Sequence, residues 1–177
     1  MNKSRVLLAF FVSFFALTSV AFAQTEIELG PRVGYELDTY ESFLIGADVR
    51  IATPSLPVRI NPTLDYFFVD DDFSGGASGV DVSVTVFQLG VNALYDLPLP
   101  ELSFMPYVGA GIALTRATVE LDVAGVGSGE NSDTEAGINL IGGLTFPTNN
   151  LKPFVQVQVT IGDPDLFSLV GGLLFSF

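Results

Sequence analysis

The chain ends with the sequence LFSLVGGLLFSF, residues 166–177, in which two kinds of side chain alternate. One parity of this stretch consists of Phe167, Leu169, Gly171, Leu173, Phe175 and Phe177. The other parity includes both serines of the stretch, Ser168 and Ser176. Because successive side chains of a β-strand point to opposite faces, this period of two predicts one amphipathic strand that stops at a terminal aromatic residue. A terminal strand of this kind, in a chain that begins with an export signal, points to an outer membrane.

The other end of the chain has the features of a secretory signal peptide. Lys3 and Arg5 precede an apolar run, and Ala21-Phe22-Ala23 provides a small-x-small cleavage site. The apolar run is shorter than the ~20 residues that a membrane-spanning helix needs, which favours cleavage over an uncleaved anchor. We therefore predict a cleaved signal peptide at residues 1–23 and a single mature domain at residues 24–177.

Composition limits the chemistry that the mature chain can perform. It has 177 − 23 = 154 residues, with all 20 acidic side chains and five of the seven basic ones, so its net charge is 5 − 20 = −15. Such a chain lacks the basic surface that nucleic-acid phosphates require, and nucleic-acid binding is not expected. The chain has no cysteine and no histidine. This absence removes disulfides, a thiolate nucleophile, an imidazole base and the usual zinc ligands, so we predict no catalytic residue, no cofactor and no transition-metal site.

Alternation with a period of two continues through the mature chain and divides it into eight segments. The clearest segment is 27–37, where odd positions are apolar or aromatic, apart from Pro31, and even positions are charged or glycine. Turn sequences rich in proline, glycine, asparagine and aspartate separate several of the segments. The expected strands are 27–37, 43–51, 58–68, 80–95, 102–115, 138–146, 151–161 and 166–177.

Two features interrupt this regular pattern. The apolar residues of the fourth segment change parity between Val86 and Phe87, which we interpret as a β-bulge near the rim. A long polar stretch, residues 118–135, is expected to be the longest loop.

Each odd-numbered segment also carries a proline on its apolar face, and since proline cannot donate a ladder hydrogen bond, we expect these residues near the rim. They are Pro31, Pro62, Pro106 and Pro153.

Alternating strands also build soluble sandwiches and barrels, so the solvent has to be argued separately. In a soluble fold the aliphatic face would point inward and lone glycines, such as Gly30, Gly34 and Gly46, would face water. In a membrane barrel the aliphatic face meets lipid, and glycines and charges fill a narrow interior. A closed barrel also satisfies every backbone group inside the protein. We therefore predict an all-β, eight-stranded, antiparallel up-and-down transmembrane β-barrel, with a soluble periplasmic barrel as the alternative.

The aromatic residues of the expected strands fall at two heights. With the amino terminus in the periplasm, one girdle contains Tyr35, Phe43, Tyr66, Phe68 and Phe167. The other girdle contains Tyr95, Phe104, Phe146, Phe175 and Phe177. Connections at 53–57, 97–101 and 147–150 are short, and we expect them on the periplasmic side.

At this point the chain resembles a known family, the small eight-stranded outer-membrane β-barrel proteins of the OmpA/OmpX-like "porin family" type. The resemblance covers Gln24 to Phe177 and rests on the signal, the strand Met105-Pro106-Tyr107-Val108-Gly109-Ala110-Gly111 and the terminal phenylalanine. It implies a place in the outer membrane of a Gram-negative bacterium. It also implies insertion by the outer-membrane assembly machinery, which in such proteins reads the last strand; here Phe175 and Phe177 are the expected assembly signal.

Charged side chains on the inward parity form the candidate site. A buried charge needs a partner, so we expect the arginines and the lysine to pair with the carboxylates. The expected lumen charge network consists of Glu28, Arg32, Asp48, Arg50, Arg59, Asp65 and Lys152. Further inward polar candidates are Glu36, Gln88, Asn92, Asp96, Tyr107, Asn139, Gln156 and Gln158. A salt-bridged plug is the favoured interpretation, and a solute path is the alternative, because eight strands enclose room for side chains or one small ligand but no wide channel.

The functional prediction is a non-enzymatic, monomeric barrel in outer-membrane lipid, with a role in envelope structure or surface interaction. One alternative is a narrow porin or transporter for small or apolar solutes. Another is an adhesin or Ca²⁺-dependent surface binder, because carboxylates are suitable Ca²⁺ ligands. The acidic loop residues are Asp70, Asp71, Asp72, Asp81, Glu120, Asp122, Glu130, Asp133, Glu135, Asp163 and Asp165. No Asp-x-Asp-x-Asp-Gly loop is present among them, which favours solvated surface charge.

Overall fold

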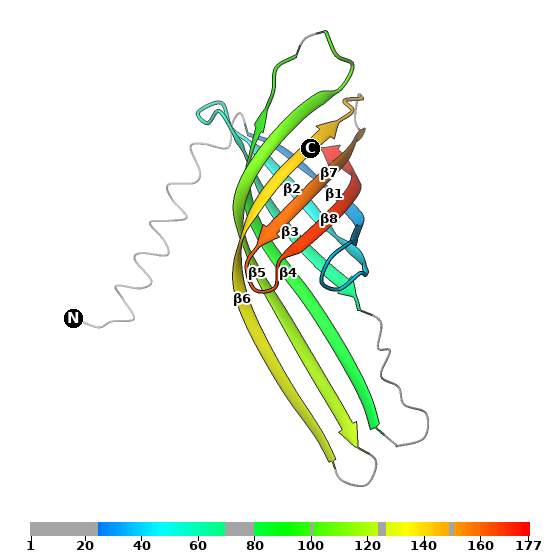
Figure 1. Ribbon diagram of the computed structural model, residues 1–177. Helices are drawn as coiled ribbons and strands as arrows, with labels where there is room; N and C mark the ends of the chain where they lie inside the picture. Colours follow the sequence, from blue (N-terminus) through cyan, green and yellow to red (C-terminus); the bar gives the residue numbers. More distant parts are fainter. Residues whose placement is uncertain (1–24, 70–79, 100, 124–126, 149–150) are drawn as a thin grey trace, which may run out of the picture.

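Eight antiparallel strands form a closed barrel in the computed structural model of the chain (Figure 1). Each strand pairs with the next one along the sequence, and β1 closes the barrel by pairing with β8. The strands are β1 Glu26–Glu36, β2 Phe43–Ala52, β3 Arg59–Phe68, β4 Val80–Asp96, β5 Met105–Val123, β6 Gly127–Thr145, β7 Leu151–Ile161 and β8 Leu166–Ser176. The predicted fold class is confirmed.

The structure describes residues 25–69, 80–99, 101–123, 127–148 and 151–177. The predicted signal peptide at residues 1–23 and the acidic residues Asp70, Asp71 and Asp72 lie outside this part of the chain. Within it there is no helix that is long and apolar enough to span a membrane.

The burial of β7 shows which parity faces the interior. Gln156 and Gln158 are 2% and 3% exposed, whereas the neighbouring Val155 and Val157 are 45% and 37% exposed. A soluble barrel would bury the valines and expose the amides. The apolar parity therefore forms the outer surface, as in a barrel whose solvent is lipid.

Three strands are much longer than the other five. β4, β5 and β6 have 17, 19 and 19 residues, and the others have 10 or 11. Pairing of β4 with β3 begins only at Val86, and pairing of β6 with β7 begins only at Ile138. The remaining parts, residues 80–85, 118–123 and 127–137, pair only among β4, β5 and β6. We call them the projecting sheet, and Figure 1 shows it as green-to-yellow strands that extend beyond the barrel.

The expected loop at residues 118–135 is therefore wrong. Each residue from Thr118 to Val123 has a cross-strand partner on both β4 and β6, so the strands continue to the described ends of the hairpin. Successive side chains at 131–135 point to opposite faces and are all exposed, so both faces of this part of the stretch meet water, which explains its polar character. The polar residues of this stretch correctly indicate that it lies in water, but a polar sequence does not distinguish a loop from a strand.

The expected β-bulge in β4 is also wrong. Its pairing with β3 and with β5 proceeds without a skipped residue, and Val86 is buried while Phe87 faces outward. The apolar residues change parity because the solvent changes along the strand. Beyond Phe87 the outer positions are the polar Thr85 and Ser83, whereas Val86 and Val84 lie on the inward parity and belong to or pack against the buried apolar residues.

Proline positions follow the expectation only in part. Pro106 and Pro153 are the second and third residues of their strands, but Pro31 is the sixth of the eleven residues of β1. The ladder between β1 and β8 omits Gly30 and Pro31, whereas the ladder between β1 and β2 includes both. The missing N–H of Pro31 is thus accommodated by a local gap on one side of the strand, away from the rim.

Aromatic residues of the outer surface contact one another at both ends of the barrel. Near the projecting sheet, the ring centroids of Tyr35 and Phe43 are 4.9 Å apart, and Tyr66 packs against Phe68 at the same distance. At the opposite end, the centroids of Phe104 and Phe146 are 6.1 Å apart. These contacts mark the two heights at which aromatic side chains line a membrane barrel.

We predict that Val157→Arg destabilises the barrel in lipid vesicles by about 2–4 kcal/mol, because it places a charge near mid-height of the outer surface. Urea unfolding followed by the mobility of unboiled protein on gels measures the change. Asn131→Arg, at an exposed position of the projecting sheet opposite Val119, is the matched control and should be nearly neutral. Equal losses in both variants would contradict the placement of Val157 in lipid.

Candidate functional site in the barrel lumen

Four buried charges from three adjacent strands form the centre of the lumen. Nε of Arg32 lies 3.0 Å from Oδ1 of Asp65, and its Nη1 lies 3.6 Å from Oδ2 of Asp48. Nε of Arg50 lies 3.1 Å from Oδ1 of Asp48. The two cations balance the two carboxylates, which a group of charges buried away from water requires.

The strand register brings two of these charges together across a glycine. Gly46 of β2 is the cross-strand partner of both Arg32 in β1 and Asp65 in β3. A Cβ atom at Gly46 would collide with the Asp65 carboxylate and with the backbone of Leu64. The missing side chain therefore provides the space in which the Arg32–Asp65 pair forms.

Arg50 reaches from β2 to strands on other sides of the barrel. Its guanidinium lies over the rings of Tyr107 and Phe154, 4.8 Å and 4.3 Å from their centroids. It also donates hydrogen bonds to the Tyr107 hydroxyl at 3.1 Å and to Oγ1 of Thr145 at 3.2 Å. This single side chain therefore connects β2 with β5, β6 and β7 across the interior.

Amide side chains extend the charged centre in two directions. Gln158 accepts from Arg32 at 3.1 Å and donates to Gln88 at 3.0 Å, and Gln88 donates to Thr115 at 3.0 Å. A second chain of hydrogen bonds begins at Asp48 and passes through Asn61, Asn92, Asn139 and Thr160, with lengths of 2.8, 3.2, 2.9 and 2.7 Å. Most of the buried polar side chains in the lumen thus have partners, as low-dielectric surroundings demand.

A second ionic group lies near the barrel end that carries the short connections. Arg59 contacts Asp96 and lies 3.4 Å from Glu28, while Lys152 contacts Glu28 and lies 2.8 Å from Glu26. Glu28 therefore joins the two cations. These side chains are more exposed than the central four, and we call them the rim ionic group.

The structure thus divides the seven predicted network residues between two sites. Arg32, Asp48, Arg50 and Asp65 form the centre, and Glu28, Arg59 and Lys152 belong to the rim ionic group. All eight further polar candidates lie on the inward parity as well. Their role in the protein remains a prediction.

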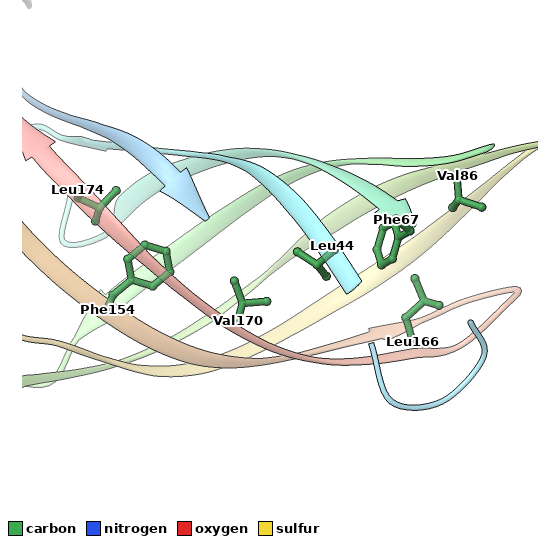
Figure 2. Packing of buried hydrophobic residues seen from close by; sticks show 7 residues of the cluster. All are labelled: Leu44, Phe67, Val86, Phe154, Leu166, Val170 and Leu174. Carbon is green, nitrogen blue, oxygen red and sulfur yellow. The ribbon is translucent and has the colours of Figure 1, made fainter. Parts of the chain in front are cut away.

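An apolar cluster fills much of the remaining interior, and sequence reasoning missed it. Its buried members are Leu44, Phe67, Val86, Phe154, Leu166, Val170 and Leu174, shown in Figure 2. Three of them come from β8, whose inward side carries no charged residue and only the two serines as polar residues. Their inward parity could have been deduced by counting from a charged neighbour, as from Asp65 to Phe67. Alternation alone assigned apolar residues to lipid.

Glu36 organises the connection between β1 and β2. Its buried carboxylate accepts five backbone hydrogen bonds, from the N–H groups of Asp38, Thr39, Tyr40, Glu41 and Phe167, at 2.6 to 3.3 Å. Burial, and secondly the Glu36 charge, raises the pKa of Tyr40. The loop and the start of β8 are thereby fixed over the apolar cluster, against which Tyr40 packs.

Closed eight-stranded barrels with an apolar exterior and a filled, ion-paired interior are a class of membrane proteins. The sequence matches the model of a family described as the outer membrane protein beta-barrel domain, over residues 7–168. The chain belongs to this family. It is an integral protein of the Gram-negative outer membrane, as the sequence predicted.

Several solved structures share the fold. The N-terminal β-barrel domain of Pseudomonas aeruginosa OprF is 17% identical with a TM-score of 0.60, covering 87% of this chain and 98% of that one. Neisserial surface protein A is 16% identical with a TM-score of 0.60, covering 86% and 97%. A major outer membrane protein from Thermus thermophilus is 13% identical with a TM-score of 0.65, covering 86% and 99%. No curated protein matches the sequence.

We predict that Asp48→Asn lowers the free energy of unfolding by about 3–5 kcal/mol, because it leaves Arg32 and Arg50 with one carboxylate between them in a buried site. Urea titration of the protein in lipid vesicles measures this loss. Glu135→Gln removes one acidic charge at an exposed position and should change the stability by less than about 0.5 kcal/mol. The central ion pairs would lose their assigned importance if the two variants unfolded at the same urea concentration.

Proposed function

We propose that this protein is a non-enzymatic outer-membrane barrel that presents its projecting sheet as an interaction surface outside the cell. The observation that carries the proposal is the free edge of β6. Residues 127–137 of β6 pair with β5 and not with β7, whose ladder begins at Ile138. An edge strand presents backbone N–H and C=O groups that can bind another extended chain.

The hydrogen bonding of the edge supports this proposal. The backbone N–H of Thr134 donates to its neighbour's carboxylate, Oδ1 of Asp133, at 2.8 Å. A local carboxylate thus occupies a donor that an added strand would otherwise use. Replacing this hydrogen bond by a ladder bond to an added strand would cost little free energy, because the released carboxylate is then hydrated by water.

The charge of the projecting sheet indicates the chemistry of the partner. Asp133, Glu135 and Glu120 are exposed, and among the described residues of the projecting sheet and next to it Arg116 is the one basic side chain, hydrogen-bonded to Ser132 at 3.1 Å. An acidic surface attracts basic partners and raises their rate of association. The favoured partner is therefore an extended polypeptide segment with basic side chains.

The lumen supports a structural barrel over a solute path. The Arg50 bridge, the two amide chains and the apolar cluster occupy its interior. Absence of histidine and cysteine from the sequence supports the proposal that the protein is not an enzyme. Among the described residues, no group of three or more acidic side chains is arranged to hold a metal ion, so a Ca²⁺ site would have to involve residues 70–72 or other undescribed side chains.

We further propose that assembly involves the C-terminal strand and that the protein is a monomer. Phe175 and Phe177 are both exposed on the outer parity, where an assembly factor can contact them. The N–H of Phe177 donates to the carbonyl of Ile27 at 3.1 Å, so this end completes the seam between β8 and β1.

Thr134→Pro tests the edge. It removes the edge N–H, and the loss of one or two ladder bonds of ~1 kcal/mol each predicts roughly tenfold weaker binding of a basic strand. The probe is a short fluorescent peptide of alternating lysine and threonine, and its anisotropy is followed as protein-containing vesicles are added. Ser103→Pro, at the opposite end of the molecule, is the control and should bind as the unaltered protein does. Equal binding by the Thr134→Pro variant would refute the edge as the docking site.

Conductance across a planar bilayer tests the lumen. We expect no stable ion-conducting openings from the unaltered protein, because side chains fill its interior. Arg50→Ala combined with Tyr107→Ala removes the bridge across the barrel and should introduce openings. Ion-selective openings in the unaltered protein would favour the narrow porin instead.

A further inference from the structure

An apolar groove of about 370 Å³ lies at the barrel end opposite the projecting sheet. Its lining includes Leu97, Pro98, Leu99, Leu102, Phe104 and Pro147. Backbone hydrogen bonds hold the connection between β4 and β5 that forms most of it. The N–H of Leu97 donates to the carbonyl of Pro106 at 2.8 Å, and that of Leu102 to Leu99 at 3.1 Å. The described residues of this connection, 97–99 and 101–104, are therefore joined by backbone hydrogen bonds to each other and to β5.

The groove carries apolar side chains where a water-facing turn would carry polar ones. Leu99 and Leu102 are 51% and 42% exposed. The neighbouring turn between β2 and β3 has hydroxyl groups instead, with Thr53 and Ser55 hydrogen-bonded to each other. That turn holds one exposed leucine, Leu56, which is not among the residues that line this groove. Contiguous exposed apolar surface with a concave shape indicates a binding site.

The position of the groove identifies its occupant. Phe104 lines the groove and also contacts Phe146 in the aromatic girdle at this end of the barrel. Pro147, which also lines the groove, directly follows Phe146. The groove is thus continuous with the outer surface that meets lipid, at the height where aromatic residues mark the membrane interface. We propose that it holds one acyl chain of an inner-leaflet phospholipid.

This occupant accounts for both the shape and the composition of the connection. An acyl chain is apolar, narrow and present at high concentration beside Phe104, and it would remove Leu99 and Leu102 from water. The bound lipid would tie the β4–β5 connection to the membrane surface on one side of the barrel. The proposal is independent of any role of the projecting sheet or of the lumen.

Fluorescence quenching tests the proposal directly, because the chain has no tryptophan of its own. Leu99→Trp and the control Leu56→Trp each introduce a single fluorophore at an exposed leucine of a short connection. Both proteins are folded into vesicles of phosphatidylcholine that carries bromine on its acyl chains, and folding is verified by gel mobility before boiling. We expect the Leu99→Trp protein to lose most of its fluorescence and the Leu56→Trp protein to keep most of it.

A second measurement avoids the preference of tryptophan itself for membrane interfaces. Native mass spectrometry of Leu102→Glu should show loss of a retained phosphatidylcholine that the unaltered protein and Leu56→Glu keep. Equal quenching at the two tryptophan positions, or equal lipid retention by the two glutamate variants, would overturn the proposal. Weak quenching at both positions would also overturn it, and would leave the groove open to water and available to a periplasmic protein instead.

Discussion

The structure depends on one constraint, that no backbone N–H or C=O group can remain unpaired in hydrocarbon. Pairing of β1 with β8 removes the two edges that an open sheet would expose. Closure with eight strands then fixes a narrow interior. Once the barrel is closed, each inward position must be filled by the chain itself and each inward charge must find its partner there.

The interior meets this demand by matching side-chain length to strand register. Long side chains, such as Arg50, cross the barrel, and glycines stand where a crossing side chain needs room. Gly143 is the cross-strand partner of Tyr107, and a Cβ there would collide with the tyrosine ring. Gly46 has the same relation to the Arg32–Asp65 pair. Gly46, one of the glycines that argued against a soluble fold, and Gly143 thus provide the room for the arginine and tyrosine side chains that close the lumen.

Period-two alternation was sufficient to predict that eight strands exist and which parity of their charges faces inward, because both depend on local geometry alone. The seven network residues were selected on this basis, and the structure places their ion pairs in the lumen. The apolar character of Phe67 and Leu174 did not reveal that they face inward, because apolar residues are compatible with both lipid and a dry interior; only counting from a polar neighbour, such as Asp65 for Phe67, gives the parity. Nor could alternation distinguish a polar loop from a polar strand at residues 118–135. That distinction depends on pairing with β4 and β6, which is a non-local property.

The expected bulge in β4 and the expected loop at residues 118–135 were wrong for the same reason, which is that the solvent outside the sheet changes along the strands. The position of this change marks the membrane boundary. Phe87 pairs with Arg116, and Arg116 pairs with Thr134, so one register line crosses the three long strands. On the barrel side of this line the outer positions are Leu89, Leu114 and Ala136; on the other side Thr85, Thr118 and Ser132 follow. The ladder continues across the line without interruption, while the solvent of its outer face changes from lipid to water. A continuous sheet can therefore be rigidly anchored by closure at one end and still offer free edges at the other, since only the part in hydrocarbon is required to close.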